Sequence, residues 1–183
     1  VLDFDNKIEI SKKLLTDVAS FLKYRGPDKE GYFIKKNTDY SIGLAHKRLS
    51  IIDLSEKADQ PMLSKSGNSI IVFNGEIYNY LELKKILQKS GAQFNSNSDT
   101  EVILQAYEIW GIDKCLNMIE GMFAFALFDF KTKELVLARD RFGEKPLYYA
   151  LRDKNIAFSS DISCLLYTSD AADDSLRVDL GGR

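Results

Sequence analysis

The stretch Phe73-Asn-Gly-Glu-Ile-Tyr-Asn79 decides how the rest of the chain is interpreted. Residues 69–73, which lead into it, are short, apolar and β-branched, and this pattern predicts a buried strand. Residues 80–89, which follow it, carry apolar side chains at helical spacing among charges, and this pattern predicts a helix. We therefore expect residues 74–76 to form the turn between strand and helix, where glycine permits a positive φ.

Two interpretations of this turn stay open from its residues alone. The side-chain amide of Asn74 and the backbone N–H of Gly75 are adjacent hydrogen-bond donors. Two such donors at the end of a strand can form an oxyanion hole for acyl transfer. A tight Asn-Gly turn uses the same two residue types without any chemistry.

The composition excludes several classes of function. The chain has 183 residues, 45% hydrophobic and 28% charged, with a net charge of −2. These values are typical of one globular domain, and without a basic cluster we expect neither a nucleic-acid nor a membrane partner. No apolar run has the length of a membrane span. Two cysteines and one histidine leave little room for a metal site, and this cysteine content suits the cytoplasm.

Two charged residues are candidates for binding an amino acid. The planar guanidinium of Arg48 can hold a carboxylate through two parallel hydrogen bonds. Asp99 lies at the start of the helix that residues 102–110 predict, where an exposed carboxylate can bind an ammonium group. Ser98 and Glu101 have the spacing of a capping box, so this segment can also serve as a helix start.

Two other features are interpreted as structural. Cys115 lies among apolar residues with nothing nearby to lower its pKa, so we expect a buried, unreactive thiol. Arg139-Asp140-Arg141 interrupts a series of predicted strands, and we expect a loop held by salt bridges.

Five further blocks occur in order along the chain, and together with residues 74–79 they resemble one family. The blocks are Arg25-Gly-Pro-Asp28, Ala45-His-Lys-Arg-Leu-Ser-Ile-Ile-Asp53, Ser98-Asp-Thr-Glu101, Glu120-Gly-Met-Phe-Ala-Phe-Ala126 and Arg139-Asp-Arg-Phe-Gly-Glu-Lys-Pro-Leu-Tyr-Tyr149. The resemblance is to the glutamine-hydrolysing domain of asparagine synthetases, which are class II glutamine amidotransferases. It extends from about residue 3 to about residue 162.

The resemblance implies a fold and a set of site residues. The fold is α+β, a four-layer αββα sandwich of antiparallel sheets of the N-terminal nucleophile hydrolase type, which we expect to be incomplete here. By the resemblance, an oxyanion hole and a clamp for glutamine contain Asn74 and Gly75 (oxyanion hole), Arg48 (α-carboxylate), Asp99 (α-amine), Glu76 (assisting) and the backbone of Leu49, Ser50, Ile51 and Ile52.

The resemblance also raises expectations about the two ends of the chain. In the family the nucleophile is an N-terminal cysteine, whereas this sequence begins with Val1. Residues 164–183 are similar to a translated sequencing adapter. We therefore expect an amidotransferase domain over residues 1–163, truncated at both ends and without glutaminase activity of its own.

The partners follow from the family as well. The resemblance implies a C-terminal synthetase domain in the same chain, which adenylates aspartate with ATP and Mg²⁺ and accepts the ammonia, whereas the glutaminase domain itself needs no cofactor. A homodimer and a cytoplasmic location are further expectations. Two alternatives stay open: a non-catalytic glutamine-binding or scaffolding domain of the same fold, and a glutaminase domain attached to a synthetase with another acceptor.

Overall fold

A computed structural model describes residues 1–170, which form helices and two antiparallel sheets. The chain divides into two units, described separately below. The first contains Val1–Leu49 and the residues from Pro146 onward, and the second contains Ser50–Lys145.

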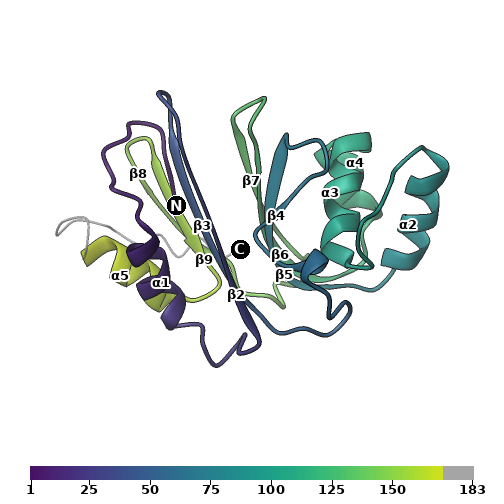
Figure 1. The fold of residues 1–183 in the computed structure, drawn as a ribbon, viewed down its shortest axis with the longest axis horizontal. Coiled ribbons are helices and arrows are strands. Elements are labelled where there is room, and N and C mark those ends of the chain that lie inside the picture. Colours follow the sequence, from purple (N-terminus) through teal and green to yellow (C-terminus); the bar gives the residue numbers. More distant parts are fainter. Residues whose placement is uncertain (171–183) are drawn as a thin grey trace. The chain divides into compact units, whose positions relative to one another are not determined.

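The first unit is a five-stranded antiparallel sheet with two helices packed on one face (Figure 1). The strand order is β2-β3-β1-β9-β8. The elements are β1 (Leu2–Asp3), α1 (Lys12–Ser20), β2 (Lys29–Lys36), β3 (Ser41–Arg48), β8 (Tyr148–Arg152), β9 (Asn155–Ser159) and α5 (Ile162–Asp170).

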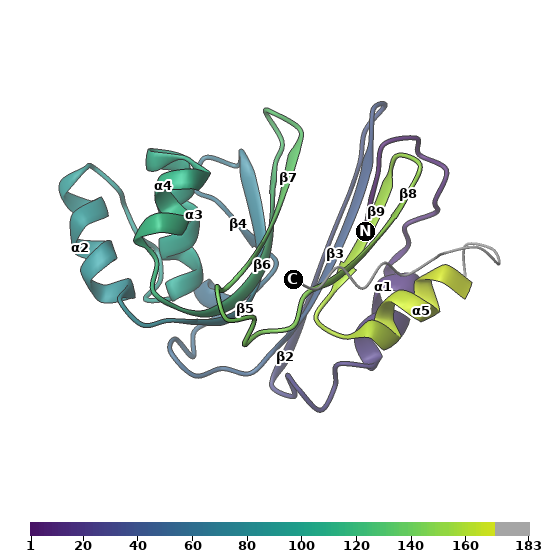
Figure 2. The same ribbon diagram turned by 180° about the vertical axis from the view of Figure 1, so that it is seen from behind.

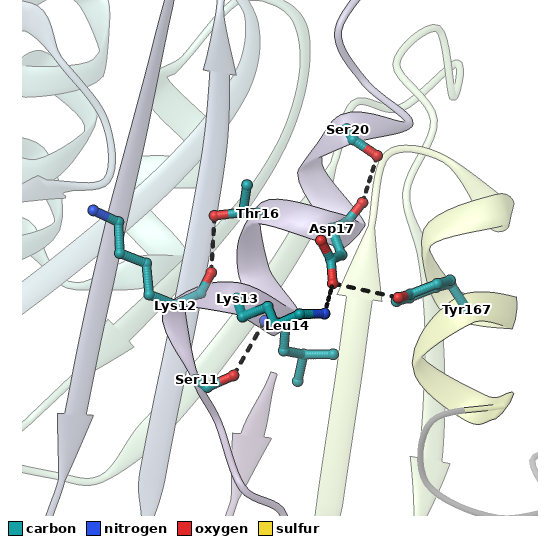
Figure 3. Close-up of polar contacts among 8 residues, drawn as sticks. All are labelled: Ser11, Lys12, Lys13, Leu14, Thr16, Asp17, Ser20 and Tyr167. Atoms are coloured by element: carbon teal, nitrogen blue, oxygen red, sulfur yellow. Dashed lines mark hydrogen bonds and ion pairs between the residues drawn. The ribbon is translucent and has the colours of Figure 1, made fainter.

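Apolar residues at helical spacing between residues 8 and 24, with Ser11 as a possible N-cap, predict a helix where α1 lies. The Ser11 hydroxyl accepts a hydrogen bond from the N–H of Leu14 at 3.1 Å, which confirms Ser11 as the N-cap. On the exposed side, Asp17 accepts from the Lys13 ammonium at 2.9 Å and from the Tyr167 hydroxyl at 3.4 Å (Figure 3). These contacts join α1 to α5 within the same helical layer.

The second unit is a four-stranded antiparallel sheet, order β4-β5-β6-β7, with its helices on one face (Figure 2). A mostly apolar cluster between helix α3 and the sheet forms its core, with Phe73, Ile103 and Phe125 almost fully buried. The elements are a 3₁₀ turn (Glu56–Ala58), β4 (Met62–Leu63), β5 (Ser69–Ile77), α2 (Tyr80–Lys89), α3 (Asp99–Trp110), α4 (Ile112–Met118), β6 (Gly121–Asp129) and β7 (Glu134–Arg139).

The expected turn at residues 74–76 is not a turn. Strand β5 continues through them to Ile77, and Gly75 is not among the residues with positive φ. The physical reason is close packing against β6, because a Cβ on Gly75 would lie 2.3 Å from the carbonyl oxygen of Met122 and 2.7 Å from the Cα of Phe123. Glycine is needed here for space and not for an unusual backbone angle.

The predicted fold class is confirmed in its main features. Each unit contributes one antiparallel sheet and one layer of helices, as expected of the α+β class. None of the helices within residues 1–170 combines the length and the apolar character needed to cross a bilayer. Of the segment expected to derive from an adapter, residues 164–170 belong to α5 and residues 171–183 lie outside the described part of the chain.

Candidate functional site

The site is built on the edge of β5 that faces away from β6. Because backbone groups alternate in direction along a strand, the N–H groups of Phe73, Gly75 and Ile77 point to this edge. The N–H of Phe73 donates to Oε1 of Gln60 at 2.6 Å, and the N–H of Ile77 donates to Oδ2 of Asp99 at 3.1 Å. Between them, the N–H of Gly75 has no hydrogen bond to any residue from 1 to 170.

The ladder between β5 and β6 explains why this N–H has no partner in the sheet. Gly75 is paired with Phe123 of β6. Both backbone groups of Phe123 bond to the other side, since its N–H donates to Asp140 and its carbonyl accepts from the Asp140 N–H. The Gly75–Phe123 pair is therefore one of the pairs that exchange no backbone hydrogen bonds.

The side chain of Asn74 supplies a second donor of the same kind. Its Nδ2 is shielded from solvent and has no hydrogen-bond partner in the described part of the chain. Buried polar groups without partners are uncommon in folded proteins and each one calls for a reason. Two such donors on adjacent residues can together bind an oxygen atom that becomes negatively charged.

Asp99 lies beside these donors at the start of α3. Its Oδ1 accepts from the N–H of Thr100 at 2.9 Å, and the hydroxyl of Ser98 accepts from the same N–H at 3.1 Å. The expectation of an exposed carboxylate is wrong, because Asp99 is only 5% exposed. Burial raises the pKa of Asp99, and the negative charge of nearby Glu76 raises it further. A cation bound here would relieve both effects.

The capping box predicted at this helix start forms only in part. Ser98 caps the helix, but Glu101 does not reach back to Ser98. Its carboxylate accepts instead from the N–H groups of Asn95 and Ser96, at 2.8 and 2.7 Å, and from the Ser96 hydroxyl at 2.6 Å. The loop before α3 therefore supplies the hydrogen-bond donors of the Glu101 carboxylate. These bonds hold the loop against the first turn of α3.

Gln60 is a buried residue of this region that the sequence analysis interprets as structural and does not count among the site residues. Besides accepting from Phe73, its side chain donates to the Thr100 hydroxyl at 3.3 Å. It thus joins the strand residue before Asn74 to the helix residue after Asp99. Its environment depends on contacts 13 and 40 residues away, which a local pattern does not reveal.

The remaining predicted residues divide between the two units. Asn74, Gly75, Glu76 and Asp99 lie together in the second unit. Arg48 is the last residue of β3 in the first unit and is only 8% exposed. The loop segment expected to line the pocket crosses the boundary, with Leu49 in the first unit and Ser50, Ile51 and Ile52 in the second.

The two features interpreted as structural have different outcomes. Cys115 is fully buried, and burial raises the pKa of its thiol to about 12, which confirms an unreactive cysteine. The expected salt-bridged loop at 139–141 is wrong. The Arg139 guanidinium donates to the backbone carbonyls of Lys145, at 2.6 Å, and Gly143, and within residues 1–170 none of these three residues forms an ion pair. The same stretch contains no cluster of three His, Cys, Asp or Glu side chains that could hold a metal ion.

The chain is similar to several known proteins. A family model described as a glutamine amidotransferase domain matches residues 2–179. A putative asparagine synthetase [glutamine-hydrolyzing] 2 of Methanocaldococcus jannaschii is 42% identical over 173 residues, covering 86% of this chain and 33% of that protein. Asparagine synthetase [glutamine-hydrolyzing] 1 of Bacillus subtilis is 39% identical, covering 85% of this chain and 24% of that protein. The chain thus spans a third or less of the length of these relatives.

Solved structures share the fold. The glutamine phosphoribosylpyrophosphate amidotransferase from B. subtilis aligns with a TM-score of 0.57 over 72% of this chain and 30% of that one, at 23% identity. An allosteric regulatory enzyme of purine biosynthesis aligns with a TM-score of 0.58 at 25% identity, over 73% of this chain and 30% of that one. At this level of identity the first likeness concerns the fold alone.

Proposed function

The chain belongs to the glutamine amidotransferase domain family, and from that premise we propose that this domain binds L-glutamine and, as part of a longer protein, releases ammonia from the side-chain amide. The observation that carries the proposal is the pair of adjacent donors without partners, Nδ2 of Asn74 and the N–H of Gly75. Amide hydrolysis passes through a tetrahedral species with a negative oxygen, and each donor aimed at such an oxygen is worth about 3 kcal/mol.

The proposed clamp for the substrate uses the charges of an amino acid. Arg48 would hold the α-carboxylate through its two parallel N–H groups, next to the backbone of residues 49–52. Asp99 would hold the α-ammonium, assisted by Glu76. The raised pKa of Asp99 supports this part, because a desolvated carboxylate beside another carboxylate gains most from a bound cation.

The proposed chemistry proceeds through a cysteinyl thioester, with the N-terminal cysteine of a longer protein as nucleophile. Its sulfur would attack the amide carbon, while the two donors bind the oxyanion. Collapse of this intermediate would break the C–N bond and release ammonia, with the proton carried by the α-amine of the cysteine. Water would then hydrolyse the thioester to glutamate and regenerate the thiol.

The cysteines of this chain do not suit that role. Cys115 and Cys164 are both buried, and burial raises the pKa of each thiol. A nucleophilic cysteine needs access to substrate and a lowered pKa. We therefore propose that the 183-residue chain binds glutamine without hydrolysing it.

The wider role is taken from the names of the relatives. In the complete protein, a synthetase domain in the same chain would use the ammonia to amidate aspartate, as a ligase dependent on ATP and Mg²⁺. We propose that those cofactors bind to the synthetase domain. A cytoplasmic location, which the free thiol of Cys115 suits, and self-association as a homodimer complete the proposal.

Calorimetric titration of the 183-residue chain tests the proposal directly. L-Glutamine should bind, whereas 4-carbamoylbutanoate lacks the ammonium and 4-aminobutanamide lacks the carboxylate, so both should bind at least about tenfold more weakly. Asp99→Asn and Arg48→Ala should each weaken L-glutamine binding by a similar factor. No ammonia should appear when the wild-type chain is incubated with L-glutamine.

Asp113→Asn is a matched control, because Asp113 lies in the first turn of α4 as Asp99 does in α3, but is exposed. It should leave binding unchanged. Equal affinity for the three compounds would refute the clamp. Ammonia release that Arg48→Ala abolishes would refute the claim that this chain lacks a nucleophile.

A further inference from the structure

The carboxylate of Asp140, the first residue after β7, accepts hydrogen bonds from four backbone N–H groups. Its Oδ1 accepts from the N–H groups of Phe142 and Glu144 at 3.1 and 2.9 Å. Its Oδ2 accepts from those of Lys145 and Phe123 at 3.0 and 3.2 Å. Three of these donors belong to the loop after β7, and the fourth belongs to β6.

The bond to β6 leads to the proposed oxyanion hole. Phe123 also accepts from the Asp140 N–H at 2.8 Å, so both of its backbone groups are held by one residue. Phe123 is the ladder partner of Gly75, and the two backbones are so close that there is no room for a Cβ between them. A shift of Phe123 must therefore move Gly75 as well, since close-packed backbone transmits displacement.

We propose that Asp140 is a positioning residue, which sets the place and direction of the Gly75 N–H by fixing Phe123. Asp140 touches no reacting atom in this proposal. Its importance for amide hydrolysis rests on the proposed function, but the mechanical link from Asp140 through Phe123 to Gly75 can be measured without any ligand.

Asp129 offers a matched comparison at the other end of the same strand. Its Oδ1 accepts from the N–H groups of Lys131 and Thr132 at 2.7 and 3.0 Å, and its Oδ2 accepts from the Tyr107 hydroxyl at 2.9 Å. It thus holds a turn in the same way as Asp140, but it lies at the end of the ladder where β5 begins, six residues from Gly75 in register. A general loss of stability would follow from changing either aspartate, whereas a displaced Gly75 should follow only from changing Asp140.

The experiment compares backbone amide resonances in the ¹⁵N-labelled 183-residue chain and in Asp140→Asn, Asp140→Glu and Asp129→Asn. Asp140→Asn loses acceptor capacity for two of the four donors and should shift the resonances of Phe123 and Gly75. Asp140→Glu keeps both carboxylate oxygens, so its Gly75 amide resonance should lie between those of the wild type and Asp140→Asn. Asp129→Asn should shift the amide resonances of Lys131 and Thr132 and leave the Gly75 resonance unchanged.

Titration of the same samples with L-glutamine separates this inference from the proposed function. If the wild type binds, Asp140→Asn should bind several-fold more weakly, and Asp129→Asn should bind as the wild type does. If the wild type does not bind, the proposed function fails, while the ligand-free resonances still decide the role of Asp140. A Gly75 resonance that is unchanged in folded Asp140→Asn, or shifted equally by Asp129→Asn, overturns the inference. Should Asp140→Asn fail to fold, a Gly75 shift in Asp140→Glu but not in Asp129→Asn carries the same decision.

Discussion

Asp99 and Asp140 are two buried aspartates in the same unit, 5% and 6% exposed, and each lies against the end of a strand. Asp140 accepts hydrogen bonds from four backbone N–H groups, whereas Asp99 accepts from two and has Glu76 as a neighbour. The pKa values shift in opposite directions. Burial raises that of Asp99 and the charge of Glu76 raises it further, but at Asp140 the four donors outweigh burial and lower it. The additional donors at Asp140 and the charge of Glu76 at Asp99 distinguish the carboxylate that holds the loop after β7 from the one that we propose binds a ligand.

The largest effect expected from this comparison is on stability. Asp140→Ala leaves four backbone N–H groups without their acceptor, and each unsatisfied buried group costs about 1–3 kcal/mol. Because water can reach part of the loop, we expect the free energy of unfolding to fall by about 3 kcal/mol. Asp99→Asn keeps one acceptor oxygen and removes a desolvated charge, so we expect a change below about 1 kcal/mol. Urea unfolding of both variants measures these values.

Asp113→Asn serves as the reference for neutralising an exposed aspartate on this unit. Equal losses of stability from Asp140→Ala and Asp99→Asn would break the distinction between the two sites. A larger loss from Asp99→Asn would reverse it.

The effect of pH on the free energy of unfolding should be of intermediate size, and Asp99 and Asp140 should contribute to it with opposite signs. The ordinary aspartate pKa is 3.8. At Asp140 the ionised form stabilises the fold, so its contribution is present above 3.8 and is lost as the pH falls through the lowered pKa. At Asp99 the protonated form is favoured by the fold, so its contribution is present below 3.8 and is lost as the pH rises through the raised pKa.

The protonation of Asp99 should also control the affinity for L-glutamine. Only the ionised Asp99 attracts an ammonium, so the affinity for L-glutamine should weaken as the pH falls through the raised pKa, at a higher pH than an ordinary aspartate would give. Calorimetric titrations at a series of pH values measure this, and Asp99→Asn should lack that step. A step of the same size in Asp99→Asn would assign the titration to another group.

The smallest effect concerns the neighbour of Asp99. Glu76→Gln removes the negative charge that adds to the raised pKa of Asp99, although burial, the larger cause, remains. The pH at which L-glutamine binding weakens should therefore move down slightly. The ¹³C carboxyl resonance of Asp99, followed through a pH titration of both chains, measures the shift. A pKa of Asp99 that moves up would show that Glu76 acts on it other than by its charge.

Local features of the chain were predictable and long-range ones were not. The Ser11 cap and the helix after Tyr80 depend on neighbouring residues, so pattern alone locates them. Asn74 and Gly75 were identified as donors, but in a turn, because pairing with Ala124 and Phe123 of β6, 50 and 48 residues further along, extends β5 through them. Asp140 was interpreted through charge alone, since its donor on β6 becomes its neighbour only in the folded sheet.

The tight packing at Gly75 determines which residues a selection for folding can accept at this position. A Cβ there would overlap β6, and a Cβ at Gly121 would lie 2.1 Å from the carbonyl oxygen of Glu76. A library selected only for folding would therefore return glycine at both positions, whether or not its members ever meet glutamine. Asn74 is different, because its Nδ2 bonds to nothing in the described residues, and a folding selection alone has no reason to keep it. Retention of asparagine at position 74 when the longer protein is selected for ammonia release, and its loss under selection for folding, would distinguish chemistry from packing in a way that position 75 never can.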